Sequence, residues 1–123
     1  MERVNHTELG EMENRFAQLI WKHQPIPSGE LTRLCEQEFE WKKSTTYTML
    51  KRLCQRGIFE NENGMVKALI SQEEFYAEKG ARVIKENFGG SLPRFLAAFV
   101  KKNALGQEEI DQLQQLIDQY KGE

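Results

Sequence analysis

The chain has 123 residues, which is enough for one domain or for one small domain with an appended element. Hydrophobic residues make up 39% of it and charged residues 29%, a composition that excludes a disordered chain. No apolar run approaches the roughly 20 residues that a membrane-spanning helix needs, and the first residues lack the apolar core of a signal peptide. We therefore expect a cytoplasmic protein that does not insert into a membrane.

The charge is unevenly distributed along the chain. The formal net charge is −2, yet residues 41–67 contain six Lys or Arg against two Glu, a local charge of +4. From residue 71 onward there are seven Lys or Arg against nine Asp or Glu. Because nucleic acids attract a local cluster of cations rather than a net charge, a DNA contact is expected within residues 41–67.

Two helices are predicted before residue 40. The first runs over about residues 8–21, with Thr7 as its cap and apolar side chains at helical spacing. Pro25 and Pro27 exclude a helix between them. Ser28 is then the predicted N-cap of a second helix that reaches about Phe39.

A third helix and a β-hairpin are predicted next. The helix starts at Ser44 or Thr45 and ends at about Arg56, with Gly57 as the residue that terminates it. Residues 58–70 are typical of two short strands, because the Asn63-Gly64 pair is a strong signal for a hairpin turn. A strand near Trp41 is expected to complete the small sheet.

Three more helices are predicted after the hairpin. Ser71 and Glu74 have the spacing of a capping box, which starts a helix there. Ser91 is the predicted cap of a helix over about residues 92–101, and the last helix covers about residues 107–120. The order predicts a mostly α-helical protein with a small β-hairpin wing: a winged helix-turn-helix domain over residues 1–70 and a helical dimerisation domain over residues 71–123.

The third predicted helix has two different faces. Thr46, Leu50 and Leu53 would point inward, whereas hydroxyl and cationic side chains lie outward or at the borders. A recognition helix needs this division, because its outer face must reach base edges and phosphates in the major groove. The alternative is that these outer side chains are only solvated. The candidate DNA-binding residues are Lys42, Lys43, Ser44, Thr45, Tyr47, Thr48, Lys51, Arg52 and, on the hairpin, Lys67.

Tyr47 could contact DNA or pack against a neighbouring side chain, and the sequence leaves both readings open. Trp21 and Trp41 are expected in the core and at a hinge. Cys35 and Cys54 each lie among apolar residues at helical spacing, which predicts buried free thiols. No metal-ligand spacing, nucleophile–base pair or phosphate-binding loop is present, so neither an enzyme nor a bound cofactor or metal is expected.

The two last predicted helices carry apolar stripes that a small winged domain cannot cover. Pairing with a second copy would bury them; the alternative is a monomeric helical subdomain. A dimer would also match a two-fold symmetric DNA site. The candidate dimerisation residues are Leu92, Phe95, Leu96, Phe99, Val100, Ile110, Leu113, Leu116, Ile117 and Tyr120.

Residues 41–57 resemble the central motif of the penicillinase and methicillin-resistance repressors, which are grouped with the copper-transport repressors. That motif is Trp-Ser-Pro-x-Thr-Val-x-Thr-x-x-x-Arg-Leu-x-x-Lys-Gly. The residues at the matching places are Trp41, Thr45, Thr48, Arg52, Leu53 and Gly57. Residues 70–76 and 89–92 and the pair Phe99-Val100 extend the resemblance over nearly the whole chain.

The resemblance implies a homodimeric repressor that binds a palindromic operator of double-stranded DNA. In the antibiotic-responsive branch it also implies a membrane sensor protease, whose signal leads to cleavage in the C-terminal domain; the matching bond here is Ala98-Phe99, where those members have Asn-Phe. The copper branch has cysteine pairs near its C-terminus, and this tail has none, which favours the antibiotic-responsive branch.

The chain departs from the family pattern at several positions. Lys42-Lys43 replaces Ser-Pro before the recognition helix, so Ser44 is expected to take over the cap, and Thr46 stands where Val or Ile is usual. The wing lacks the Gly-Arg pair and the aromatic residues that often follow its turn. The alternative function is a winged-helix module that binds another protein and no DNA, which the weak overall charge and the neutral wing favour.

Overall fold

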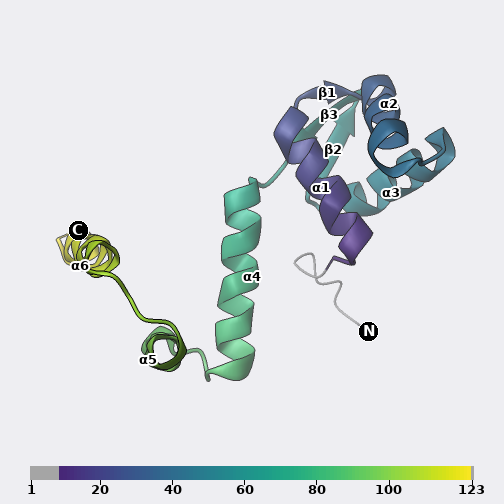
Figure 1. Ribbon diagram of the computed structural model, residues 1–123. Helices are drawn as coiled ribbons and strands as arrows, with labels where there is room; N and C mark the ends of the chain where they lie inside the picture. Colours follow the sequence, from purple (N-terminus) through teal and green to yellow (C-terminus); the bar gives the residue numbers. More distant parts are fainter. Residues whose placement is uncertain (1–8, 123) are drawn as a thin grey trace. The chain divides into compact units, whose positions relative to one another are not determined.

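The computed structural model describes residues 9–122, and it is mostly α-helical with a small β-sheet, as predicted (Figure 1). The elements in chain order are α1 (Glu11–His23), β1 (Ile26–Pro27), α2 (Ser28–Phe39), α3 (Lys43–Gln55), β2 (Phe59–Glu62), β3 (Met65–Ala68), α4 (Gln72–Asn87), α5 (Leu92–Lys102) and α6 (Gln107–Lys121). Three helices followed by a hairpin make a winged helix-turn-helix arrangement.

The hairpin forms where the Asn63-Gly64 pair predicts it. β2 and β3 are antiparallel, with Glu60 opposite Lys67 and Glu62 opposite Met65. Asn63 and Gly64 have φ values of 54° and 85°, the left-handed backbone that a tight two-residue hairpin turn requires. Local sequence chemistry therefore sets the position of the wing.

The third strand is not near Trp41, and that prediction is wrong. The sheet order is β1-β3-β2, and β1 is the segment Ile26–Pro27 between α1 and α2. Ile26 is buried, and Pro27 can occupy this strand because an edge strand leaves one side without hydrogen-bond partners. Trp41 instead packs its ring against Phe16 and Phe39, with centroids 5.4 Å and 4.9 Å away.

The core of the first unit is continuous from α1 to the start of α4. Trp21 is buried as expected, and its ring packs against Phe59 and Phe75, each at a centroid distance of 5.3 Å. Its indole N–H donates to the carbonyl oxygen of Ile70 at 3.0 Å, so the polar atom of this buried ring is satisfied. Trp21 thus ties α1 to the segment that leads from the wing into α4.

Two compact units divide the chain, the first ending at Gly80 and the second beginning at Ala81. The boundary falls inside α4 because the first turns of this helix belong to the first core. Phe75 is fully buried there, and the Tyr76 hydroxyl accepts a hydrogen bond from Gln18 Nε2 at 3.0 Å. The assignment of DNA binding to residues 1–70 and of dimerisation to residues 71–123 stays a prediction.

Several helix ends follow their capping residues. Gly57 has a φ of +78° just after α3. The capping box at the start of α4 is confirmed, because the Glu74 N–H donates to Ser71 Oγ at 3.0 Å and the Ser71 N–H donates to Glu74 Oε1 at 3.3 Å. Ser91 Oγ accepts from the N–H of Arg94 and caps α5, as predicted.

Three helix starts differ from the prediction. α1 starts at Glu11 and extends to His23, whereas Thr7 and the predicted start at residue 8 lie outside the described residues. Ser28 is the first residue of α2 and not its N-cap, a position that Pro27 holds. α3 begins at Lys43, so Ser44 does not take over its cap. Both serines are predicted N-caps because of the side-chain preference at that position, but the helical backbone begins one residue earlier at α2 and two residues earlier at α3.

Candidate nucleic-acid interface

The predicted recognition helix α3 presents the candidate residues to solvent. All nine side chains predicted to contact DNA are exposed: Lys42, Lys43, Ser44, Thr45, Tyr47, Thr48, Lys51, Arg52 and Lys67. On the opposite face, Thr46, Leu50 and Leu53 are buried, and Met49 is half-buried against the same core. The helix is therefore anchored on one side and free on the other, as a DNA-reading helix must be.

The outer face of α3 carries positive charge that the protein leaves uncompensated. Among residues 9–122, no acidic side chain forms an ion pair with Lys42, Lys43 or Lys51. The Arg52 guanidinium lies 3.7 Å from the sulfur of Met49, a neutral atom. A face of this kind attracts the phosphates of a nucleic acid.

The amino terminus of α3 lies within this positive region. Its N-cap is Lys42, which provides no side-chain hydrogen bond to the first turn. The N–H groups of that turn therefore need an outside partner, and the positive end of the helix dipole favours an anionic one. Lys42 and Lys43 place two ammonium groups beside the same end.

The hydroxyl groups on α3 differ in their availability. Thr48 Oγ1 donates to the carbonyl oxygen of Ser44 at 2.9 Å, which leaves its oxygen able to accept a further hydrogen bond. The Tyr47 hydroxyl donates to Ser28 Oγ at 3.2 Å, so Tyr47 both packs on α2 and stays partly exposed. Sequence reasoning assigned Ser28 to a cap and missed this contact, because no local pattern links residues 28 and 47.

The wing contributes less positive charge than its one lysine suggests. Lys67 Nζ lies 3.2 Å from Glu60 Oε2, the carboxylate directly opposite it in the hairpin. Glu62 stands exposed beside the turn. Lys67 is thus exposed but paired, and its contact with DNA stays a prediction.

Both cysteines are free thiols, but only Cys35 has the burial that the sequence predicts for both. Cys35 is fully buried, and burial raises the pKa of its thiol to about 11, while the hydroxyl of Thr46 acts in the opposite direction. Burial also raises the pKa of Cys54, which is half-buried. No group of three or more potential metal ligands occurs within the described part of the chain.

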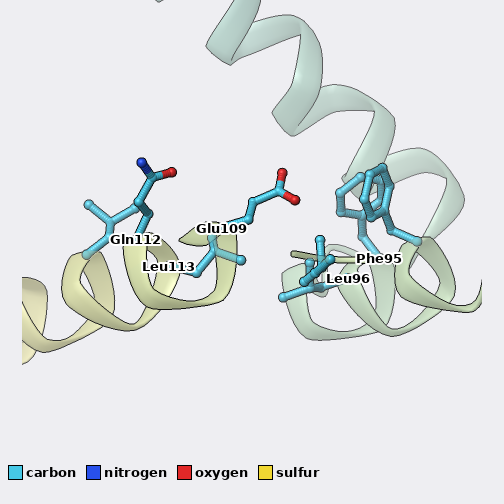
Figure 2. A pocket seen from close by; sticks show the side chains of 8 residues that line it. Phe95, Leu96, Glu109, Gln112 and Leu113 are labelled. Atoms are coloured by element: carbon cyan, nitrogen blue, oxygen red, sulfur yellow. The ribbon is translucent and has the colours of Figure 1, made fainter. Parts of the chain in front are cut away.

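Over its described residues, 81–122, the second unit has no buried core. None of the described residues of α5 or α6 is buried, although both helices have apolar stripes. An open groove of about 370 Å³ lies between these two helices. Figure 2 shows Phe95 and Leu96 of α5 on one side of it and Leu113 of α6 on the other. The ten predicted dimerisation residues are all exposed or half-buried, and Leu116, Ile117 and Tyr120 keep between 50% and 78% of their surface in solvent.

The bond matching the family's cleavage position lies inside α5. Ala98 and Phe99 are exposed, and the Phe99 carbonyl accepts hydrogen bonds from the backbone and side-chain nitrogens of Asn103 at 2.9 and 3.1 Å. The side chains on both sides of this peptide bond are exposed, but the bond itself is part of the hydrogen-bonded helix. Cleavage there stays a prediction, and it would require local unwinding of α5.

The chain is similar to known proteins over most of its length. The chain is 25% identical over 118 residues to the penicillinase repressor of Bacillus licheniformis, covering 93% of this chain and 92% of that protein. It is 20% identical over 115 residues to the methicillin resistance regulatory protein MecI of Staphylococcus aureus, covering 90% and 94%. An uncharacterized 16.5 kDa protein of Latilactobacillus sakei is 25% identical over 117 residues, covering 92% and 80%.

In residues 9–122, no helix is long and apolar enough to cross a membrane. The model of the penicillinase repressor family matches residues 9–119, which is nearly all of the chain and includes both compact units. The chain therefore belongs to the penicillinase repressor family.

Proposed function

We propose that this protein is a cytoplasmic transcriptional repressor that binds operator DNA through the outer face of α3. The observation that carries this proposal is the set of unpaired lysines Lys42, Lys43 and Lys51 and of exposed hydroxyl groups on that face, on a helix whose other side is anchored in the core. Two of the relatives are named as a penicillinase repressor and a methicillin resistance regulator, so a β-lactam resistance gene is the proposed target.

Dimerisation on a palindromic operator is the second part of the proposal. Its support is the second unit, whose apolar stripes on α5 and α6 lie uncovered in a single chain. Leaving such surface in water is unfavourable, at roughly 25 cal/mol per Å², and a second copy would cover it. Two linked winged domains would also bind two half-sites far more tightly than one domain binds one.

The DNA-binding part is tested by fluorescence anisotropy with the promoter DNA upstream of the gene and with a scrambled duplex, at two salt concentrations. We expect tighter binding to the promoter and an affinity that falls steeply with salt. Lys51→Ala should weaken binding and reduce the slope of log K against log salt by about 1. Lys22→Ala, which changes another exposed lysine near the end of α1, is the matched control and should leave both unchanged.

The dimer is tested by sedimentation equilibrium. Leu116→Glu places a charge on the uncovered stripe of α6 and should shift the protein to monomer. Leu69→Glu is the matched control, because Leu69 is similarly exposed but lies in the first unit, and this variant should remain a dimer. A monomeric wild-type protein at micromolar concentration would refute this part.

The second candidate function is a winged-helix module that binds a protein partner without DNA. The paired Lys67 and the exposed Glu62 favour it, because such a wing offers little attraction to phosphate. Equal, weak binding to promoter and scrambled DNA at low salt would support this module and reject the repressor.

A further inference from the structure

Ser28 joins three elements of the winged domain. Its backbone N–H donates to the carbonyl oxygen of Gly64 in the wing turn at 2.7 Å. Its side-chain oxygen accepts from the hydroxyl of Tyr47 on α3 at 3.2 Å. Ser28 is itself the first residue of α2. One half-buried residue therefore connects α2, the recognition helix and the tip of the wing.

The hydrogen bond restricts the side chain of Tyr47. The hydroxyl oxygen lies in line with the bond that joins the ring to Cβ, so holding it fixes the direction in which the ring extends from α3, while the ring plane can still turn about that line. Tyr47 keeps 36% of its surface exposed in this position. Its ring thus extends from the outer face of α3 in one direction, because its polar end is held at Ser28.

The backbone contact restricts the wing turn. Gly64 has a φ of +85°, and a methyl group placed on it would come within 3.9 Å of Ser28 Oγ, so the turn lies close to this side chain. The carbonyl of Gly64 is held by the N–H of Ser28, which also sits beside the register pair Pro27 and Met65. The Tyr47 ring and the wing turn are therefore positioned from the same residue.

We propose that Ser28 is a positioning residue of the DNA-reading surface, which orients the Tyr47 ring relative to the wing, and that this orientation contributes to operator specificity. The inference rests on the proposed repressor function. A binding surface whose side chains are already ordered loses less entropy on complex formation, and a fixed ring distinguishes one base sequence from another better than a mobile ring does.

A double-mutant cycle tests the proposal. Ser28→Ala removes the acceptor and Tyr47→Phe removes the donor of the same hydrogen bond, and neither changes a charge or the Ser28 backbone contact. Each variant should bind promoter DNA about fivefold more weakly, because the freed side chain must then be ordered on binding, and should bind scrambled DNA as the wild type does. The double variant should be no weaker than either single variant, because the bond can be lost only once.

Two readouts separate positioning from general damage to the fold. The salt dependence of binding should be the same in all four proteins, since no phosphate-binding cation is altered. Ser28→Thr keeps the hydroxyl and should restore promoter binding. Urea unfolding of each variant establishes that the compared proteins are equally folded.

The outcomes are distinguishable. Single variants that bind the promoter like the wild type, or losses that multiply in the double variant, would overturn the role of Ser28 while leaving the repressor function intact. A wild-type protein that does not distinguish promoter from scrambled DNA would instead reject the proposed function itself.

Discussion

Replacing Thr46 with valine is expected to stabilise the protein. Thr46 lies on the inner face of α3 with 1% of its surface exposed, and its hydroxyl oxygen is buried without a hydrogen-bond partner of normal geometry among the described residues. The nearby thiol of Cys35 is only a weak hydrogen-bonding group. A buried hydroxyl without a good partner costs about 1–3 kcal/mol.

The expected gain follows from what valine keeps and what it removes. Valine has the same branched shape as threonine and a similar helix propensity, so the packing of α3 should be preserved. The substitution removes the buried hydroxyl and adds an apolar methyl group. We expect the free energy of unfolding to rise by about 1–2 kcal/mol, and the Tm to rise by about 4–8 °C for each kcal/mol in a domain of this size.

Urea unfolding at one fixed protein concentration measures this effect through the fluorescence of Trp21 and Trp41. Thr48→Val on the same helix is the matched control, because the hydroxyl of Thr48 is exposed and already donates to the Ser44 carbonyl. Its effect should stay within about 0.5 kcal/mol. If Thr46→Val lowered the free energy of unfolding by 1 kcal/mol or more, the hydroxyl would have a real partner, and the reasoning from an unsatisfied group would be refuted.

Three further predictions concern the wing, a helix end and the buried thiol. Glu62→Lys should tighten promoter binding several-fold at low salt and steepen the slope of log K against log salt by about 1. Anisotropy titrations that match those of the wild type would place the wing away from DNA. Glu40→Gly should raise the free energy of unfolding by about 1 kcal/mol, because Glu40 has a φ of +58° at the end of α2, and a loss of stability in urea unfolding would contradict this. Since folding raises the pKa of Cys35 from 9.0 to about 11, the folded state holds the thiol proton more tightly. The stabilisation from Cys35 is therefore complete below pH 9 and is lost as the pH rises to about 11. Urea unfolding across this range should show that the free energy of unfolding falls with pH, and that it falls less steeply in Cys35→Ala. An identical fall in that variant would exclude the thiol as its cause.

Much of the secondary structure could be predicted from the sequence alone, because the signals act between near neighbours in the chain. The hairpin needs only Asn63 and Gly64, and the starts of α4 and α5 need only Ser71 with Glu74 and Ser91 with its own first turn. The two faces of α3 likewise follow from helical periodicity, so the exposed candidate residues could be named in advance.

Tertiary structure decided the features that depend on partners far apart in the chain. The third strand is Ile26–Pro27 rather than a segment near Trp41, because its partner is β3, some 40 residues later, and periodicity does not reveal such a pairing. The contact of Ser28 with Tyr47 and Gly64 arises only when the folded core brings these residues together, whereas the pairing of Lys67 with Glu60 follows from the local register of the hairpin. The sequence by itself thus determined which helix could face DNA, whereas the packing of α2 beside that helix and the wing turn determined that the Tyr47 side chain is held in place.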